Sequence, residues 1–101
     1  MLNAYKLALD AARNVVLEYK DQNKRLFEEY RDAYTTIKLA VKNNFKFIEA
    51  INNNNRSLSL YFIDEEEFQT EIAFTEYTGI RVAQAFCKAY QAANTLNELC
   101  F

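Results

Sequence analysis

Residues 2–51 read LNAYKLALDAARNVVLEYKDQNKRLFEEYRDAYTTIKLAVKNNFKFIEAI, and the predicted fold depends on this stretch. Apolar or neutral residues recur along it at alternating steps of three and four, from Leu2 and Tyr5 to Phe47 and Ile51. No charged residue falls on this stripe, and no Gly or Pro interrupts the stretch. Such a period is typical of a long helix that packs along another helix as in a coiled coil. The sequence therefore predicts one helix over about residues 2–50.

A helix of that length has consequences for assembly, because it would extend about 70 Å at 1.5 Å per residue. A chain of 101 residues cannot cover such a stripe alone, so two copies are expected to pair as a homodimer and form a helical bundle. The predicted seam between them consists of Leu9, Val16, Leu26, Ile37 and Phe47. The alternative is a break near Asp21 within the polar run Lys20–Lys24, or at Asn43–Asn44, which would give a compact monomeric four-helix bundle.

An asparagine-rich loop is predicted over about residues 51–63. Asn52–Asn55 favour a turn because asparagine side chains compete for backbone hydrogen bonds. Ser57–Ile63 alternates at first between polar and apolar residues, so it is either a short extended segment or one or two helical turns.

A second helix is predicted over about residues 64–99. Asp64 is placed to serve as its N-cap, and Glu67 is the capping-box partner three residues later. Gly79, the single glycine, either interrupts this helix or lets another helix approach closely. The predicted fold class is therefore all-α, a single domain over residues 1–101 built as a long helical hairpin.

The composition limits the class of protein. Half of the residues are hydrophobic and 15% are aromatic, which is too many for a disordered chain. A net charge of −2 and a pI near 5.1 give no electrostatic basis for nucleic-acid binding. The first fifty residues hold nine basic and seven acidic residues, and the remainder hold three and seven. The first half of the chain is therefore net positive and the second half net negative. This difference suits two segments, or two copies, that lie against each other.

The expected compartment is the cytoplasm. Lys6 and Asp10 interrupt any apolar run near the N-terminus, so no secretion signal is expected. No uncharged apolar stretch is long enough to cross a membrane, so no membrane partner is expected. Cys87 and Cys100 would lie about 20 Å apart on one helix, beyond the reach of a disulfide, so both are expected to be reduced.

The sequence contains few residues of the types that catalyse reactions or bind metals and cofactors. The absence of histidine removes the commonest general base and the usual zinc and di-iron ligands. A single glycine excludes the dinucleotide and phosphate-binding loops. Asp64–Glu67 with Glu71 form a candidate site for Mg²⁺ or Ca²⁺, although a solvated, capped helix start explains them better. We expect no cofactor, no metal and no enzymatic activity.

The aromatic content is high for a helical protein, with seven Tyr, eight Phe and no Trp. A wide aromatic core is the main interpretation. The alternative is that some tyrosines lie at a contact surface, because tyrosine buries its ring while its hydroxyl reaches a partner. The candidate partner-binding residues are Tyr19, Tyr30, Arg31 and Tyr34.

The predicted function is a non-enzymatic protein–protein interaction module of the adaptor, chaperone or inhibitor type. It would act through the surface of a helical bundle, with a second copy and another protein as its partners. One alternative is a binder of a small apolar or aromatic ligand in the bundle core. The other is a purely structural homo-oligomer.

Overall fold

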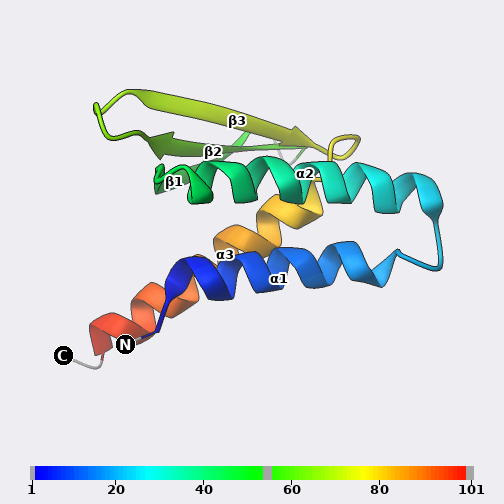
Figure 1. The fold of residues 1–101 in the computed structure, drawn as a ribbon, viewed down its shortest axis with the longest axis horizontal. Helices are drawn as coiled ribbons and strands as arrows, with labels where there is room; N and C mark the ends of the chain where they lie inside the picture. Colours follow the sequence, from blue (N-terminus) through cyan, green and yellow to red (C-terminus); the bar gives the residue numbers. More distant parts are fainter. Residues whose placement is uncertain (1, 54–55, 100–101) are drawn as a thin grey trace.

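A computed structural model of the chain describes residues 2–53 and 56–99. Its elements in chain order are α1 (Ala4–Glu18), α2 (Lys24–Lys42), β1 (Lys46–Asn53), β2 (Ser57–Ile63), β3 (Gln69–Thr75) and α3 (Ile80–Leu99). The strands form one antiparallel sheet of order β1–β2–β3, and the helices lie on one side of it (Figure 1). The fold is therefore α+β, and the predicted all-α helical hairpin, with its helical bundle and coiled coil, is wrong.

The predicted helix over residues 2–50 is divided into α1, α2 and the start of β1. The first division is at Tyr19–Asn23, so the alternative of a break near Asp21 is correct at this point and the continuous helix is wrong. Asn23 lies on the apolar stripe, but it is the N-cap of α2, where its side chain accepts a hydrogen bond from the Leu26 N–H at 3.1 Å. Asparagine is favoured at this position because it satisfies an otherwise unpaired amide.

The second division follows α2 at the other candidate break. Asn43 is the C-cap, and Asn44 has a φ of 65°, a left-handed conformation that ends the helix. The stripe continues through Phe47 and Ile51 although these residues lie in a strand. Phe47 pairs with Phe62 on the helix-facing side of the sheet, whereas Ile51 pairs with Ser59 on the outer side. An irregularity between Phe47 and Glu49 shifts the register, so the helical spacing here is a coincidence.

The predicted dimer seam lies in the core of the chain itself. Val16, Ile37 and Phe47 are buried, and Leu9 and Leu26 pack against the same cluster. Because the stripe is folded against α3 and the sheet, no 70 Å helix needs a second copy to cover it. Dimerisation remains a prediction, but this reason for expecting it no longer applies.

The segment Ser57–Ile63 is extended, as one of the two sequence alternatives proposed. Leu58, Leu60 and Phe62 are buried on the helix-facing side of β2. The predicted loop is therefore wrong over residues 51–53 and 57–63, since β1 continues to Asn53 and β2 begins at Ser57. Asn54 and Asn55, which the loop prediction also included, lie outside the described residues.

The predicted start of the second helix is a β-turn between β2 and β3. The Asp64 side chain accepts hydrogen bonds from the N–H groups of Glu66 and Phe68, both at 2.9 Å, and Glu67 has a φ of 67°. An aspartate oxygen that accepts nearby amides stabilises a turn as well as a helix start. The helix predicted from residue 64 is consequently replaced by β3, and only the part from Ile80 is helical.

Of the two alternatives that the sequence left open for Gly79, the close approach of another helix is correct. An interruption within a second helix is wrong, because a strand and a turn, and no helix, directly precede Gly79. The φ of Gly79 is +83°, a conformation that L side chains rarely adopt, and α3 begins at the next residue. A Cβ atom at Gly79 would lie 2.7 Å from the Cβ of Ala33 on α2. Glycine therefore ends the preceding turn and also allows the start of α3 to approach α2.

An aromatic cluster occupies the space between the sheet and the helices, as the main interpretation of the aromatic residues predicted. The ring of Phe47 lies 5.0–5.6 Å from the rings of Phe62, Phe86 and Tyr90. The Tyr5 hydroxyl of α1 accepts a hydrogen bond from the Phe47 N–H at 2.9 Å. Burial raises the pKa of Tyr5 from 10.0 to about 12. This hydroxyl connects the first helix to the first strand.

Replacing Tyr5 with phenylalanine should lower the free energy of unfolding by about 1–2 kcal/mol, because the partly buried Phe47 amide loses its acceptor. Unfolded Tyr5 loses its proton near pH 10, before the folded form does, so its stabilising contribution is complete below pH 10 and falls as the pH rises toward 12. The difference between wild type and Tyr5→Phe in urea denaturation should therefore shrink above pH 10. Tyr77→Phe, at an exposed position, is the control and should match wild type at neutral pH.

Gly79→Ala should destabilise the protein by about 1–3 kcal/mol, through the unfavourable φ and the contact with Ala33. The double variant with Ala33→Gly removes the contact but keeps the φ, so it separates the two causes in a double-mutant cycle. Thermal unfolding of the four proteins provides the measurement. An unchanged melting temperature for Gly79→Ala would contradict the close approach of α3 to α2.

Candidate functional site

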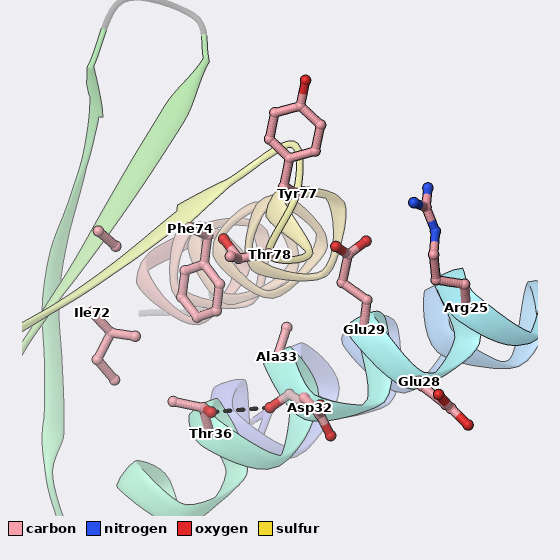
Figure 2. A pocket seen from close by; sticks show the side chains of 11 residues that line it. Arg25, Glu28, Glu29, Asp32, Ala33, Thr36, Ile72, Phe74, Tyr77 and Thr78 are labelled. Carbon is pink, nitrogen blue, oxygen red and sulfur yellow. Dashed lines mark hydrogen bonds between the residues drawn. The ribbon is translucent and has the colours of Figure 1, made fainter.

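A groove of about 510 Å³ lies between α2, β3 and the turn that joins β3 to α3 (Figure 2). We call it the α2–β3 groove. Its floor is apolar and includes Ala33 and Phe74, which are buried, and Ile72, which is half-buried. The α2 wall is polar, and the exposed Tyr77 lies at the rim. An apolar floor with a polar rim is typical of a binding surface.

The groove follows the edge of β3 rather than one face of the sheet. Ile72 and Phe74 face the helices, Ala73 lies on the opposite face, and all three residues line the groove. β3 is the last strand in the sheet order, so no described strand pairs with its other side. Its edge is therefore open along the groove.

The backbone groups on this edge follow from the hydrogen-bond pattern of an antiparallel pair. The Asp64 N–H donates to the Phe68 carbonyl at 3.1 Å, which identifies this pair as hydrogen-bonded. Hydrogen-bonded and non-hydrogen-bonded pairs alternate along the strands, so the N–H and C=O of Glu71 and Ala73 point away from β2. The Thr75 N–H fits this alternation, because it donates to the Thr78 hydroxyl at 2.6 Å instead of to β2. The groove therefore presents an unpaired backbone donor and acceptor at Ala73.

The two edges of the sheet differ in their protection. β1 carries Lys46 and the irregularity between Phe47 and Glu49, and both features discourage another strand from pairing. β3 pairs with β2 in a regular register from Gln69 to Thr75 and contains no Lys or Pro. Of the two edges, β3 is the one suited to accept a further strand.

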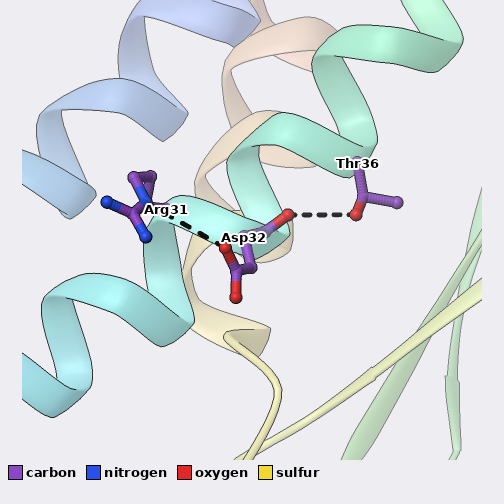
Figure 3. Close-up of polar contacts among 3 residues, drawn as sticks. All are labelled: Arg31, Asp32 and Thr36. Atoms are coloured by element: carbon purple, nitrogen blue, oxygen red, sulfur yellow. Dashed lines mark hydrogen bonds and ion pairs between the residues drawn. The ribbon is translucent and has the colours of Figure 1, made fainter.

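The α2 wall of the groove is acidic. Glu28, Glu29 and Asp32 line it together with one basic residue, Arg25. Glu29 projects toward Tyr77 in Figure 2, and no ion pair among the described residues involves it. Asp32 has only a distant contact with Arg31, at 4.0 Å on an exposed surface, while its carbonyl accepts a hydrogen bond from Thr36 at 3.0 Å (Figure 3). The carboxylates are therefore available to a positively charged group.

The turn between β3 and α3 fixes the rim. The Thr75 hydroxyl accepts a hydrogen bond from the Tyr77 N–H at 3.1 Å, and the Thr75 N–H donates to the Thr78 hydroxyl. Tyr77 remains 74% exposed and lies beside the groove. The sequence interpretation missed this residue, although Tyr77 does not share the helical spacing and stands two residues before the single glycine.

The predicted partner-binding residues do not form one surface. Tyr30 is buried, and its ring packs edge-to-face on Tyr19 at 5.1 Å. The Tyr19 hydroxyl accepts a hydrogen bond from Arg81, which also contacts Glu18 at 3.9 Å. This cluster holds the α1–α2 connection against α3.

The other two predicted residues lie on α2 outside the groove lining. Tyr34 is half-buried beside Lys38, whose ammonium lies 5.8 Å from the ring centre. Arg31 is exposed, with its guanidinium 5.7 Å from the centre of the Phe27 ring. Only Arg31 is adjacent to the groove, through its contact with Asp32.

The candidate cation site is not assembled as a cluster. Among the described residues, no three Cys, Asp or Glu side chains are grouped so as to hold a metal ion. Asp64 is engaged in the turn, and Glu71 accepts a hydrogen bond from Tyr61 on the outer face of the sheet. Within the described ranges, none of the helices combines the length and the apolar character needed to span a bilayer.

No family model, curated protein or solved structure matches this chain.

The turn between β3 and α3 is closed by the hydrogen bond from the Thr75 amide to the Thr78 hydroxyl. Because Thr78→Val removes this acceptor, it should lower the free energy of unfolding by about 0.5–1.5 kcal/mol. Thr78→Ser keeps the hydroxyl and is expected to remain close to wild type. Urea denaturation of the three proteins is the measurement. A loss for Thr78→Ser without a loss for Thr78→Val would mean that the methyl group, and not the hydrogen bond, stabilises the turn.

Proposed function

We propose that this chain is a non-enzymatic protein-interaction module, of the adaptor, chaperone or inhibitor type, that binds a segment of another protein in the α2–β3 groove. The observation that carries the proposal is the open edge of β3 at Ala73, which lies in the groove between an apolar floor and an acidic wall. Unpaired backbone groups next to apolar surface are a recurring means of peptide recognition.

A volume of about 510 Å³ would also suit a small molecule, although the alternative from the sequence was an apolar or aromatic ligand in the core of a helical bundle. The strand edge favours a protein segment instead, because only a polypeptide offers backbone groups along the whole edge. The residue types in the groove support binding of a partner rather than catalysis. They are carboxylates, one guanidinium, hydroxyls and apolar groups, and the chain has no histidine to act as a general base.

The proposal is tested by photo-crosslinking from the rim. Tyr77 is replaced by p-benzoylphenylalanine, which is a conservative change at an exposed aromatic position, and the protein is irradiated in its source cells. Phe68, 66% exposed in the turn at the other end of β3, receives the same substitution as a matched control. We expect a discrete adduct with another protein from position 77 and not from position 68.

A second variant links the adduct to the groove. Thr36→Trp places a larger side chain on the exposed α2 wall of the groove and should abolish the adduct from position 77 if the partner enters the groove. Circular dichroism tests whether this variant remains folded. The proposal is wrong if folded Thr36→Trp retains the adduct, or if positions 77 and 68 give the same products.

A further inference from the structure

The partner segment can be specified further, on the assumption that the proposed function is correct. We infer that the α2–β3 groove receives an extended, positively charged peptide segment, which pairs with β3 as a fourth strand and directs Lys or Arg side chains at the α2 carboxylates. The inference rests on three features of the groove: the free backbone groups, the apolar floor and the unbalanced charge.

The backbone of β3 determines the position of the added strand. The free N–H and C=O groups belong to Glu71 and Ala73, which are alternate residues and therefore match the repeat of a pairing strand. Toward the end of β3 the Thr75 N–H is already bonded to Thr78. Pairing is therefore limited to the region before Thr75, and the bound segment is short.

The side chains of the added strand alternate between the two faces of the sheet. Those on the helix side lie next to Ile72 and Phe74 and opposite the α2 wall. A lysine or arginine on this side lays its aliphatic stem on the apolar floor while its charged end reaches Glu29 or Asp32. A purely apolar side chain would leave those carboxylates without a partner, and an acidic one would be repelled.

A second copy of the chain fits the groove poorly. Its β3 carries Glu71 on the outer face of the sheet and no Lys or Arg, so it offers no basic side chain to the acidic wall. Its β1 edge is irregular between Phe47 and Glu49. The same charge that favours a basic segment therefore disfavours pairing between the β3 edges of two copies.

The test uses fluorescein-labelled peptides of about eight residues, a typical strand length. The first alternates Lys and Val, the second alternates Glu and Val, and the third is the Lys–Val peptide with N-methyl groups on every second amide, which prevent strand pairing along one edge. Fluorescence anisotropy with the full chain measures binding at low salt and at about 150 mM salt. We expect the Lys–Val peptide to bind at least roughly tenfold more tightly than either of the others, and more weakly at higher salt.

Two double variants locate the charge effect. Glu29→Gln with Asp32→Asn should weaken binding of the Lys–Val peptide by roughly five- to tenfold, because two rim carboxylates are neutralised. Glu65→Gln with Glu66→Gln changes the net charge equally at the β2–β3 turn and should leave binding unchanged. Amide NMR shifts at Glu71 and Ala73 on addition of the peptide would support pairing with β3.

The inference is overturned if the Glu–Val peptide binds as tightly as the Lys–Val peptide, if N-methylation has no effect, or if the control double variant weakens binding as much as the groove variant. Self-association that shifts the same two amides without any peptide would also overturn it, in favour of a second copy. Failure of the inference is distinguishable from failure of the proposed function. A groove-dependent adduct from position 77 together with no preference for the basic peptide would retain the function and reject this occupant.

Discussion

The apolar side of β2 is the constraint on which the arrangement of the molecule depends. Leu58, Leu60 and Phe62 are buried on one face of a three-stranded sheet, and such a sheet is stable only if that face is covered. All three helices consequently gather on this side, with α3 packed on β2 and α1 packed on α3 (Figure 1). Cover is concentrated over the central strand, and the α2–β3 groove is left open at the edge of the sheet.

The helical parts of the fold were the most predictable from sequence. The spacing from Ile80 onward marks α3 correctly. Both divisions of the predicted first helix, at Tyr19–Asn23 and at Asn43–Asn44, coincide with polar or asparagine-rich positions that the sequence indicates as candidate breaks. The strands were not predictable by the same reasoning. Phe47 and Ile51 preserve a helical step across an irregular strand, so periodicity continued where the structure changed. The alternation in Ser57–Ile63 was recognised, but it was too short to distinguish a strand from a helical turn.

The sequence before β3 predicts a helix for a different physical reason. An aspartate followed by glutamates satisfies unpaired amides and therefore resembles a helix start, but the same oxygen closes the Asp64–Phe68 turn. This error also concealed the candidate site. The α2–β3 groove joins segments far apart in sequence, and its key feature at Ala73 is a backbone edge that no side-chain pattern indicates. The tyrosines chosen from sequence mark the core instead, because Tyr30 fills the space between α2 and the start of α3.

An open strand edge is compatible with a sequence that contains little reactive chemistry. Backbone amides recognise an extended segment without histidine, metal ligands or glycine-rich loops, and the neighbouring side chains supply the selection. An unprotected edge is also a liability, since any exposed strand can pair with it. Glu29 and Asp32 on α2, with Glu71 on β3, reduce this risk for the strand's own copies, because two acidic edges repel. The acidic charge at the β3 edge therefore opposes pairing between two copies and favours a basic segment. The β1 edge is protected differently, by its irregular register.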